Sequence, residues 1–266
     1  MNAMRDLLGK CAVVTGAVGG LGHAIANRLA AEGAHVVING LCAPDDGAAA
    51  AAAIADAHDV EAVYDPADLT VVADIERMMA AAAERFGGVD LLINNAVVRN
   101  FAPVEKMSVR QWDTAMAVNL SAAFHTVRLA LPGMKAKGWG RIVNMSSVFG
   151  WRAIEERIEY VTTKTALIGL TRAVALEAGP YGVTCNALSP GSVPTPAIMG
   201  KVADMAKAAG KTMDEMERDY ISGRHPTGRF VARENVAALV AFLASPAGAD
   251  ITGATLPIDG GWLTTA

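Results

Sequence analysis

The sequence predicts an α/β fold: a doubly wound, seven-stranded parallel sheet with helices on both faces. Short apolar segments alternate along the chain with segments of helical periodicity. The strand-like segments are almost continuously apolar, as expected for parallel strands covered on both faces. The length of 266 residues suits one α/β domain, and neither a composition break nor an internal repeat divides it. We therefore expect a single domain spanning residues 1–266.

Each strand and helix follows from local composition and spacing. Seven apolar segments are predicted strands: KCAVVT (10–15), AHVVIN (34–39), VEAVYD (60–65), VDLLIN (89–94), RIVNMS (141–146), GVTCNALS (182–189) and ATLPID (254–259). Apolar spacing and alanine content predict helices at 21–33, 47–57, 71–86, 109–131 and 160–178. Residues 195–228 are instead polar and methionine-rich, with glycines that include Gly200, Gly210 and Gly223. We expect a mobile helical lid there, the alternative being a surface insertion.

Composition and charge exclude several classes of protein. Apolar residues make up 52% of the chain and charged residues 19%, which argues against disorder. The net charge is −4, so the basic excess typical of a nucleic-acid binder is missing. No uncharged apolar run approaches the roughly 18 residues of a membrane span, and MNAMRDLLGK (1–10) is too short and polar for a signal peptide.

The cysteines and histidines suggest neither disulfides nor a metal site. Cys11, Cys42 and Cys185 are widely spaced and form no CxxC pair. The five histidines show no metal-ligand spacing. We therefore expect a cytoplasmic protein without a bound metal.

A glycine-rich loop follows the first predicted strand. TGAVGGLG (15–22) opens the first helix, where glycines let the backbone turn tightly and approach a pyrophosphate. The N-terminus of the helix offers the anion free N–H groups. A plain glycine-rich turn is the alternative, but the strand-loop-helix context predicts dinucleotide binding.

Five more motifs follow in order. They are Asn94-Asn95-Ala96, Asn119, Ser146-Ser147 with Tyr160-x-x-x-Lys164, Pro190-Gly191 and IDGGW (258–262). Together with TGxxxGxG they resemble the short-chain dehydrogenase/reductase family over essentially the whole chain. The resemblance implies a Rossmann-like domain and a dehydrogenase or reductase acting on CH–OH groups. One departure is Val97, which stands where the family generally has glycine.

The resemblance also implies which residues bind the nicotinamide cofactor. They are Gly16, Gly19, Gly20, Leu21, Gly22, Asn39, Asp68, Leu69, Asn95, Ala96, Tyr160, Lys164, Pro190, Gly191, Val193 and Thr195. Asn39 replaces the usual ribose-binding acid, and we expect its amide to bond the ribose hydroxyls. Helix capping is the alternative role for Asp68.

The charges near the second strand favour NAD over NADP. No lysine or arginine lies between Arg28 and Arg77, and the residues after the second strand are neutral and then acidic. The additional phosphate of NADP needs a basic partner in this region. NAD is therefore the expected cofactor.

Tyr160 and Lys164 are predicted to form the catalytic centre with Ser147. Tyr160 and Lys164 are four residues apart on a predicted helix, so they share one face of it. The ammonium of Lys164 is therefore expected to lower the pKa of the Tyr160 phenol. Ser147 lies thirteen residues before Tyr160, the interval familiar in the family, so we assign it rather than Ser146 to the reacting oxygen. The resemblance further implies that Lys164 bonds the nicotinamide ribose and that Asn119 anchors a proton relay through water. An ordinary exposed Tyr/Lys pair is the alternative.

Within the family, the chain resembles the 3-hydroxybutyrate dehydrogenase-like group. Shared features are NGL after the second strand, DPADL (65–69), VNLSAAFHTVRLALPGMK (118–135) and ITGATLPIDGGW (251–262). The positions that surround the substrate carboxylate in that group are here Arg99, Phe149, Arg157 and Lys201. The group's usual two glutamines, histidine and lysine are therefore not reproduced.

Three cations at these positions predict a small anionic substrate, a carboxylate or a sulfonate. The alternatives are that Arg157 pairs with Glu156, that Lys201 is a solvated lid charge and that Phe149 belongs to the core. The predicted function is NAD-dependent hydride transfer to or from a hydroxy acid similar to 3-hydroxybutyrate. One alternative is an enzyme that acts on a neutral substrate, such as a sugar, a polyol or a 3-oxoacyl chain. The other is a regulator that binds NAD without catalysing a reaction. The resemblance implies a homotetramer built partly through the helices at 109–131 and 160–178.

Overall fold

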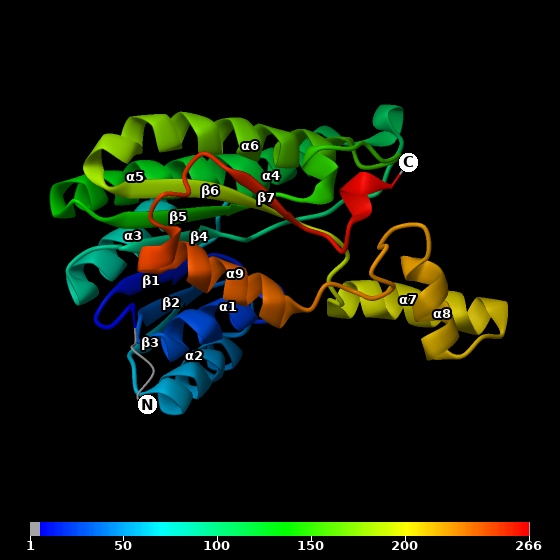
Figure 1. Ribbon diagram of the computed structural model, residues 1–266, viewed down its shortest axis with the longest axis horizontal. Coiled ribbons are helices and arrows are strands. Elements are labelled where there is room, and N and C mark those ends of the chain that lie inside the picture. Colours follow the sequence, from blue (N-terminus) through cyan, green and yellow to red (C-terminus); the bar gives the residue numbers. More distant parts are fainter. Residues whose placement is uncertain (1–5, 266) are drawn as a thin grey trace.

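A seven-stranded parallel sheet forms the centre of the computed structural model, which describes residues 6–265 (Figure 1). Its strands run β3-β2-β1-β4-β5-β6-β7 across the sheet. In chain order they are β1 (Cys11–Val14), β2 (His35–Asn39), β3 (Ala62–Asp65), β4 (Leu91–Asn94), β5 (Gly140–Met145), β6 (Val183–Pro190) and β7 (Thr255–Ile258). Each of these pairs is parallel, so the predicted fold class is confirmed.

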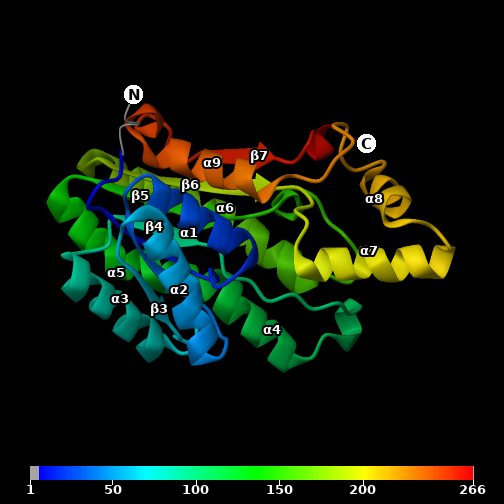
Figure 2. The ribbon, with the colours of Figure 1, turned by 90° about the horizontal axis from the view of Figure 1, so that it is seen from below.

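Two layers of helices cover the sheet (Figures 1 and 2). One layer contains α1 (Gly20–Ala31), α2 (Pro44–His58) and α9 (Arg233–Ala244). The other contains α3 (Val72–Phe86), α4 (Val109–Met116), α5 (Ala122–Lys137) and α6 (Ile158–Ala178). A separate apolar core lies on each face: alternate residues of one buried strand, such as Val13 and Val14, enter different cores. This two-sided burial explains why the strands read as continuous apolar segments.

The strand order reverses between β1 and β4. The chain winds outward from β1 to β2 and β3, then returns to the centre at β4 and winds outward in the other direction. The loops that leave the carboxyl ends of β1 and β4 therefore diverge to opposite faces, and a crevice opens between them. This reversal determines where the cavity described below forms.

The helix predicted at 109–131 is divided and longer than expected. Ser108 and Gln111 form a capping box at the start of α4, and a π-helical segment, Ala117–Ser121, joins α4 to α5. Helix α5 continues past Pro132 and ends at Lys137, because Gly138 adopts a left-handed φ of 66° there. The predicted end at residue 131 was therefore six residues too early.

The stretch predicted as a lid contains two helices, α7 (Pro196–Ala209) and α8 (Met213–Ile221). They pack together through Val202, Ala206 and Met216 and project from one end of the layered domain, at the right of Figure 1. Thr195 caps the first turn of α7. The short segment 191–195 joins the end of β6 to the start of α7.

Two further observations concern the environment of the chain. No helix within residues 6–265 is long and apolar enough to cross a membrane. Cys11, Cys42 and Cys185 carry free thiols. Residues 1–5, half of the segment from which we argued against a signal peptide, lie outside the described part of the chain.

Candidate active site

A cavity of about 280 Å³ lies at the carboxyl ends of the central strands. Its wall is formed by the glycine loop at the start of α1, by the segments that follow β4, β5 and β6, and by the first residues of α6 and α7. The predicted residues that line it are Gly16, Gly19, Gly20, Leu21, Gly22, Asn95, Ala96, Arg99, Ser147, Tyr160, Lys164, Pro190, Gly191, Val193 and Thr195. The fold therefore gathers most of the expected cofactor and catalytic positions around one space.

The glycines of the loop divide into two pairs with different surroundings. A Cβ on Gly16 would lie 2.8 Å from Cα of Ala96, and one on Gly22 would lie 2.3 Å from the carbonyl oxygen of Gly16. These two glycines permit close packing of backbone against backbone. Gly19 and Gly20 instead have no atom within 4 Å of their Cβ positions. The loop is thus fixed on one side and open on the other, which fits the approach of a pyrophosphate.

Asn95 connects the loops that follow β1 and β4. Its amide nitrogen donates to the carbonyl oxygens of Thr15 and Gly16 at 3.0 and 2.9 Å. The Thr15 hydroxyl in turn accepts the backbone N–H groups of Asn95 and Ala96. These bonds hold the glycine loop in place at the point where the strand order reverses. Asn95 and Ala96 line the cavity as predicted, and their contact with a cofactor stays a prediction.

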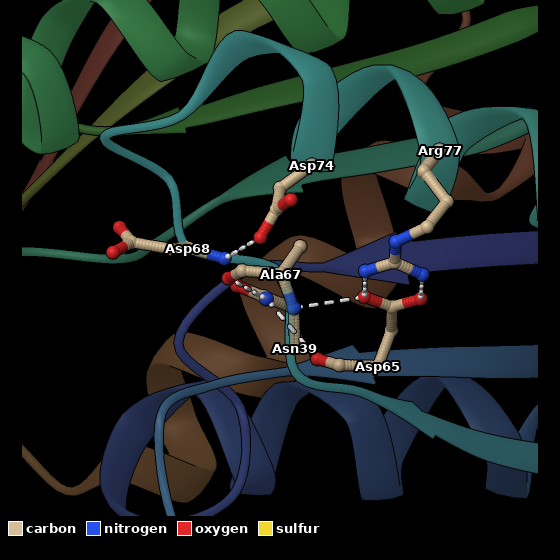
Figure 3. A network of polar contacts seen from close by, with 6 residues as sticks. All are labelled: Asn39, Asp65, Ala67, Asp68, Asp74 and Arg77. Atoms are coloured by element: carbon tan, nitrogen blue, oxygen red, sulfur yellow. Dashed lines mark hydrogen bonds and ion pairs between the residues drawn. The ribbon is translucent and has the colours of Figure 1, made fainter.

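Asn39 makes hydrogen bonds that the sequence did not predict. Its side chain is 1% exposed, and its amide nitrogen donates to the carbonyl oxygens of Asp65 and Ala67 at 3.2 and 2.9 Å (Figure 3). The parallel register places Asn39 opposite Asp65, so the amide meets the backbone where β3 ends. The amide nitrogen thus joins β2 to the segment after β3, and the expected contact of Asn39 with the ribose stays a prediction.

Asp68 and Leu69 lie outside the wall of the cavity. The carboxylate of Asp68 accepts both the N–H and the hydroxyl of Thr70 at 2.8 Å. Because Val71 occupies the N-cap of α3, Asp68 stabilises the turn ahead of the helix and not the helix end itself. Leu69 is buried in the core against this face of the sheet. Their predicted contacts with adenine stay predictions.

Ser147 and Ser146 differ as the sequence suggested. Ser147 follows β5 and accepts the N–H of Phe149 at 3.2 Å, so its own hydroxyl hydrogen can be donated to Tyr160 or to a ligand in the cavity. The Ser146 hydroxyl also reaches the wall, but it donates to the carbonyl of Lys164 at 2.8 Å. Ser146 therefore holds β5 to α6, and Ser147 is the serine suited to bind a reacting oxygen.

Tyr160 and Lys164 lie one turn apart on α6, and both are buried. The ammonium of Lys164 donates to the carbonyl of Met145 at 2.6 Å and lies 5.6 Å from the centre of the Tyr160 ring. Burial lowers the pKa of Lys164 to about 8, although the neighbouring Tyr160 opposes this change. Lys164 is thus fixed by β5 with its charge directed toward the tyrosine.

The pKa of Tyr160 is lowered by its surroundings. Burial acts to raise it, but the charges of Lys164 and Arg99 and side-chain hydrogen bonds from Ser147 and Arg99 outweigh burial. The phenolate form is therefore favoured relative to an ordinary tyrosine. This is the property that a general base for an alcohol proton requires.

Asn119 lies in the π-helical segment, with its side chain directed to the loop after β4. Its amide oxygen accepts the N–H of Val98 at 2.8 Å, and its amide nitrogen donates to the carbonyl of Val98 at 3.0 Å. This pair of bonds fixes the backbone next to Arg99. The water relay expected from the family resemblance stays a prediction.

Of the four residues predicted to bind substrate, only Arg99 belongs to the cavity wall. Arg157 is 9% exposed and packs between two rings, with its guanidinium carbon 4.2 Å from the centre of Phe101 and 4.6 Å from that of Tyr160. In the described part of the chain no ion pair joins Arg157 to Glu156, the alternative that the sequence left open. The guanidinium is instead held by aromatic faces.

Phe149 and Lys201 lie next to these groups. The Phe149 ring makes edge contacts with Tyr160 and Trp262, at centre distances of 6.3 and 5.4 Å. Lys201, on α7, brings its ammonium to 5.8 Å from the centre of the Phe101 ring. Phe101 is therefore approached by one cation from the lid helix and by Arg157. These contacts are compatible with both roles considered for Phe149, a core residue or an apolar side of the substrate site next to Tyr160.

Sequence reasoning missed Phe101, Trp262 and Glu159. Phe101 is exposed in a loop, and Trp262 belongs to a motif that we used only for family resemblance. Glu159 is fully buried beside Tyr160 and accepts the N–H of Asn100 at 2.7 Å. A glutamate on a helix usually faces solvent, so the sequence contained no signal for this role.

Comparisons with known proteins agree with this geometry. A family model described as Enoyl-(Acyl carrier protein) reductase matches residues 16–263. D-beta-hydroxybutyrate dehydrogenase of Rhizobium meliloti is 43% identical, covering 95% of this chain and 98% of its own, and that of Cupriavidus necator is 42% identical, covering 97% and 99%. L-Sorbose reductase from Gluconobacter frateurii, solved with NADPH and L-sorbose, is 26% identical, has a TM-score of 0.94 and covers 99% of this chain and 100% of that one.

Proposed function

Because the chain belongs to the short-chain dehydrogenase/reductase family, we propose that it oxidises the secondary alcohol of a small anionic hydroxy acid with NAD, or reduces the matching keto acid. The observation that carries the proposal is one cavity wall that contains Ser147, Tyr160 and Lys164 together with the guanidinium of Arg99. An acid/base group and a cation thus face the same small space. A substrate with a hydroxyl group and a negative charge suits that arrangement.

The proposed chemistry uses the groups on the wall as follows. The bound nicotinamide supplies the acceptor for a hydride. Ser147 hydrogen-bonds the substrate oxygen, and the Tyr160 phenolate accepts the hydroxyl proton while the carbon–hydrogen bond breaks and the carbonyl forms. Lys164 stabilises the phenolate through its positive charge. In the reverse direction Tyr160 returns the proton to the oxygen.

NAD is supported as the cofactor by the pairing of the nearby arginines. Arg77 makes two hydrogen bonds of 2.8 Å to the carboxylate of Asp65, as Figure 3 shows, and Arg28 pairs with Glu32. Both guanidinium groups are therefore already neutralised by carboxylates. Asp45 and Asp46 lie in the first turn of α2, directly after β2, and would repel an additional phosphate.

An anionic substrate is supported by the cations around Tyr160 and by the two D-beta-hydroxybutyrate dehydrogenases. A guanidinium can bind a carboxylate through two parallel hydrogen bonds. The second candidate is a neutral polyol or sugar, favoured by the structural similarity to L-sorbose reductase. In that case the charge of Arg99 would only lower the pKa of Tyr160 and would not bind the substrate.

A substrate panel separates these candidates. We would follow NADH absorbance with purified protein, NAD and hydroxy acids, hydroxysulfonates and neutral alcohols of matched length. Turnover confined to the anions, with a KM that rises in Arg157→Ala and in Arg99→Ala, is the expected result. Equal turnover of neutral alcohols would contradict the anionic substrate. NADP supporting faster turnover than NAD would contradict the cofactor.

We also propose a homotetramer in a reducing, cytoplasmic environment. Phe124 on α5 and Leu176 on α6 are exposed, at 51% and 81%, on two of the helices for which we expect subunit contacts. Burial of such side chains between copies would remove apolar surface from water. The three free thiols support a reducing compartment. Sedimentation analysis of wild type and Leu176→Glu tests the assembly, which the variant should weaken.

A further inference from the structure

Three cations surround the ring of Tyr160. From the ring centre the charged groups lie at 4.6 Å for Arg157, 5.5 Å for Arg99 and 5.6 Å for Lys164. Arg157 and Lys164 are buried, whereas Arg99 is exposed and belongs to the cavity wall. Lys164 also reaches the cavity wall, but Arg99 is the exposed cation of the three, so its side chain has room to contact either Tyr160 or a bound ligand.

The backbone on both sides of Arg99 is anchored. Val98 makes two hydrogen bonds with the side chain of Asn119, at 2.8 and 3.0 Å. Asn100 donates its N–H to the buried carboxylate of Glu159, the residue next to Tyr160, at 2.7 Å. The loop is thus fastened to the catalytic helix and to the π-helical segment. The backbone of Arg99 is therefore fixed in position, whereas its long side chain is free to rotate.

We propose that Arg99 is a further catalytic residue, one that hydrogen-bonds the Tyr160 oxygen until an anion binds and then turns to the anionic group of the substrate. Only the turn of Arg99 toward a substrate anion rests on the proposed function, whereas its hydrogen bond to Tyr160 does not. A planar guanidinium with five N–H donors suits this exchange, because it can donate to a phenolate oxygen and can bind a carboxylate through two parallel hydrogen bonds. Glu159 and Asn119 are the positioning residues that hold it within reach of both.

The exchange has a chemical consequence. While Arg99 bonds Tyr160, its charge and hydrogen bond both act to lower the pKa of the phenol, so the proton leaves Tyr160 easily. When a substrate carboxylate takes the guanidinium, the phenolate loses this stabilisation and its affinity for a proton rises. Tyr160 therefore becomes a stronger base at the moment when the substrate hydroxyl lies against it. A neutral alcohol would leave Arg99 on Tyr160, so discrimination would appear in kcat as well as in KM.

Titration of the tyrosine itself tests the inference. The ultraviolet absorbance of tyrosinate is followed against pH in the full chain with NAD, and the Tyr160→Phe signal is subtracted. Wild type and Arg99→Gln are each titrated under three conditions. These are no added ligand, butyrate as an unreactive anion, and butanol as a neutral control. Arg172→Gln is the matched control: it removes one exposed arginine from α6, twelve residues or about 18 Å along the helix from Tyr160.

We expect Arg99→Gln to raise the pKa of Tyr160 by about one unit, a tenfold change in proton affinity. Butyrate should raise it in wild type and in Arg172→Gln but not in Arg99→Gln, and butanol should change none of them. Circular dichroism verifies that each variant is folded. Arg99→Lys, which keeps the charge without the planar fork, should lie between wild type and Arg99→Gln.

Two outcomes overturn the inference separately from the proposed function. If Arg99→Gln titrates like wild type, Arg99 is no partner of Tyr160, whatever the substrate. If Arg99→Gln raises the pKa but butyrate has no effect on an enzyme that turns over hydroxy acids, the exchange is wrong while the proposed substrate stands. Turnover of neutral alcohols alone would instead overturn the proposed substrate and the exchange, and the contact between Arg99 and Tyr160 would remain.

Discussion

The guanidinium carbon of Arg157 lies 4.6 Å from the centre of the Tyr160 ring, so a buried cation packs against the predicted general base. Burial lowers the pKa of Arg157, and its Nε has no hydrogen-bond partner among the described residues. Aromatic faces compensate only part of the cost of burying such a charge. An anion bound beside Tyr160 would compensate more of it.

This contact predicts that Arg157→Met changes stability little but weakens substrate binding. Methionine keeps most of the apolar contact with Phe101 and Tyr160 but removes the buried charge, so the free energy of unfolding should change by less than about 1 kcal/mol. The KM for the hydroxy acid should rise about tenfold, and that for a neutral alcohol should not. Urea denaturation and steady-state kinetics measure the two effects. A marked loss of stability with an unchanged KM would show that Arg157 serves packing alone.

The two pairs of glycines in the loop predict two different kinds of variant. Gly22→Ala places a methyl group 2.3 Å from the Gly16 carbonyl, so we expect it to cost about 1–3 kcal/mol of stability and to disturb cofactor binding. Gly19→Ala meets no atom within 4 Å and has an extended backbone, so stability should remain within about 0.5 kcal/mol of wild type. Its methyl group should still weaken NADH binding about tenfold, because it enters the space left for the pyrophosphate.

Fluorescence titration with NADH and urea denaturation distinguish these glycine variants. Gly133→Ala is the control, since it also meets no atom within 4 Å but lies in α5, away from the cavity wall. It should bind NADH like wild type. Wild-type affinity in Gly19→Ala would contradict the assignment of this loop to the cofactor.

The lowered pKa of Tyr160 predicts the pH dependence of both reaction directions. Alcohol oxidation needs the phenolate, so kcat/KM should rise with pH to a plateau, with an apparent pKa below the ordinary tyrosine value of 10. Ketone reduction needs the phenol and should decline over the same range. Lys164→Met removes a cation from the phenolate, so the rise in oxidation should move to higher pH.

Because Tyr160 and Lys164 interact, these apparent pKa values belong to the pair of groups. Rates should be compared at saturating cofactor, so that a weakened cofactor contact does not enter the profile. An unchanged profile in Lys164→Met would contradict the role given to its charge.

The proposed preference for NAD predicts that a cation introduced just after β2 favours NADP. Leu41 is 72% exposed, two residues beyond the end of this strand. Leu41→Arg should supply the missing cation and raise kcat/KM with NADP at least tenfold relative to NAD. Leu8→Arg changes a leucine of the same exposure, 71%, ahead of β1 at the opposite end of that strand, and should leave the ratio unaltered. Equal effects of both variants would indicate that net charge alone sets the preference.

Local pattern in the sequence was sufficient to predict the fold and to place Tyr160 and Lys164 on one face of a helix. Apolar runs of strand length between segments of helical spacing predict the seven strands, because burial on both faces of a sheet demands that composition. The spacing of Tyr160 and Lys164 predicts that they share a face, because helix geometry depends only on sequence separation. The glycines at 16–22 were recognisable for the same reason: their conformational demands are local.

Contacts between distant parts of the chain required the tertiary structure. The parallel register sets Asn39 opposite Asp65, 26 residues away, and its amide bonds the backbone there, which the sequence did not predict. Glu159 fastens Asn100 across 59 positions, and Asn119 holds Val98 across 21. The position of Arg99 follows from these contacts. The sequence determined each element because its periodicity and turn chemistry are local, whereas side-chain partners were decided only when strand register and helix packing brought separate elements together.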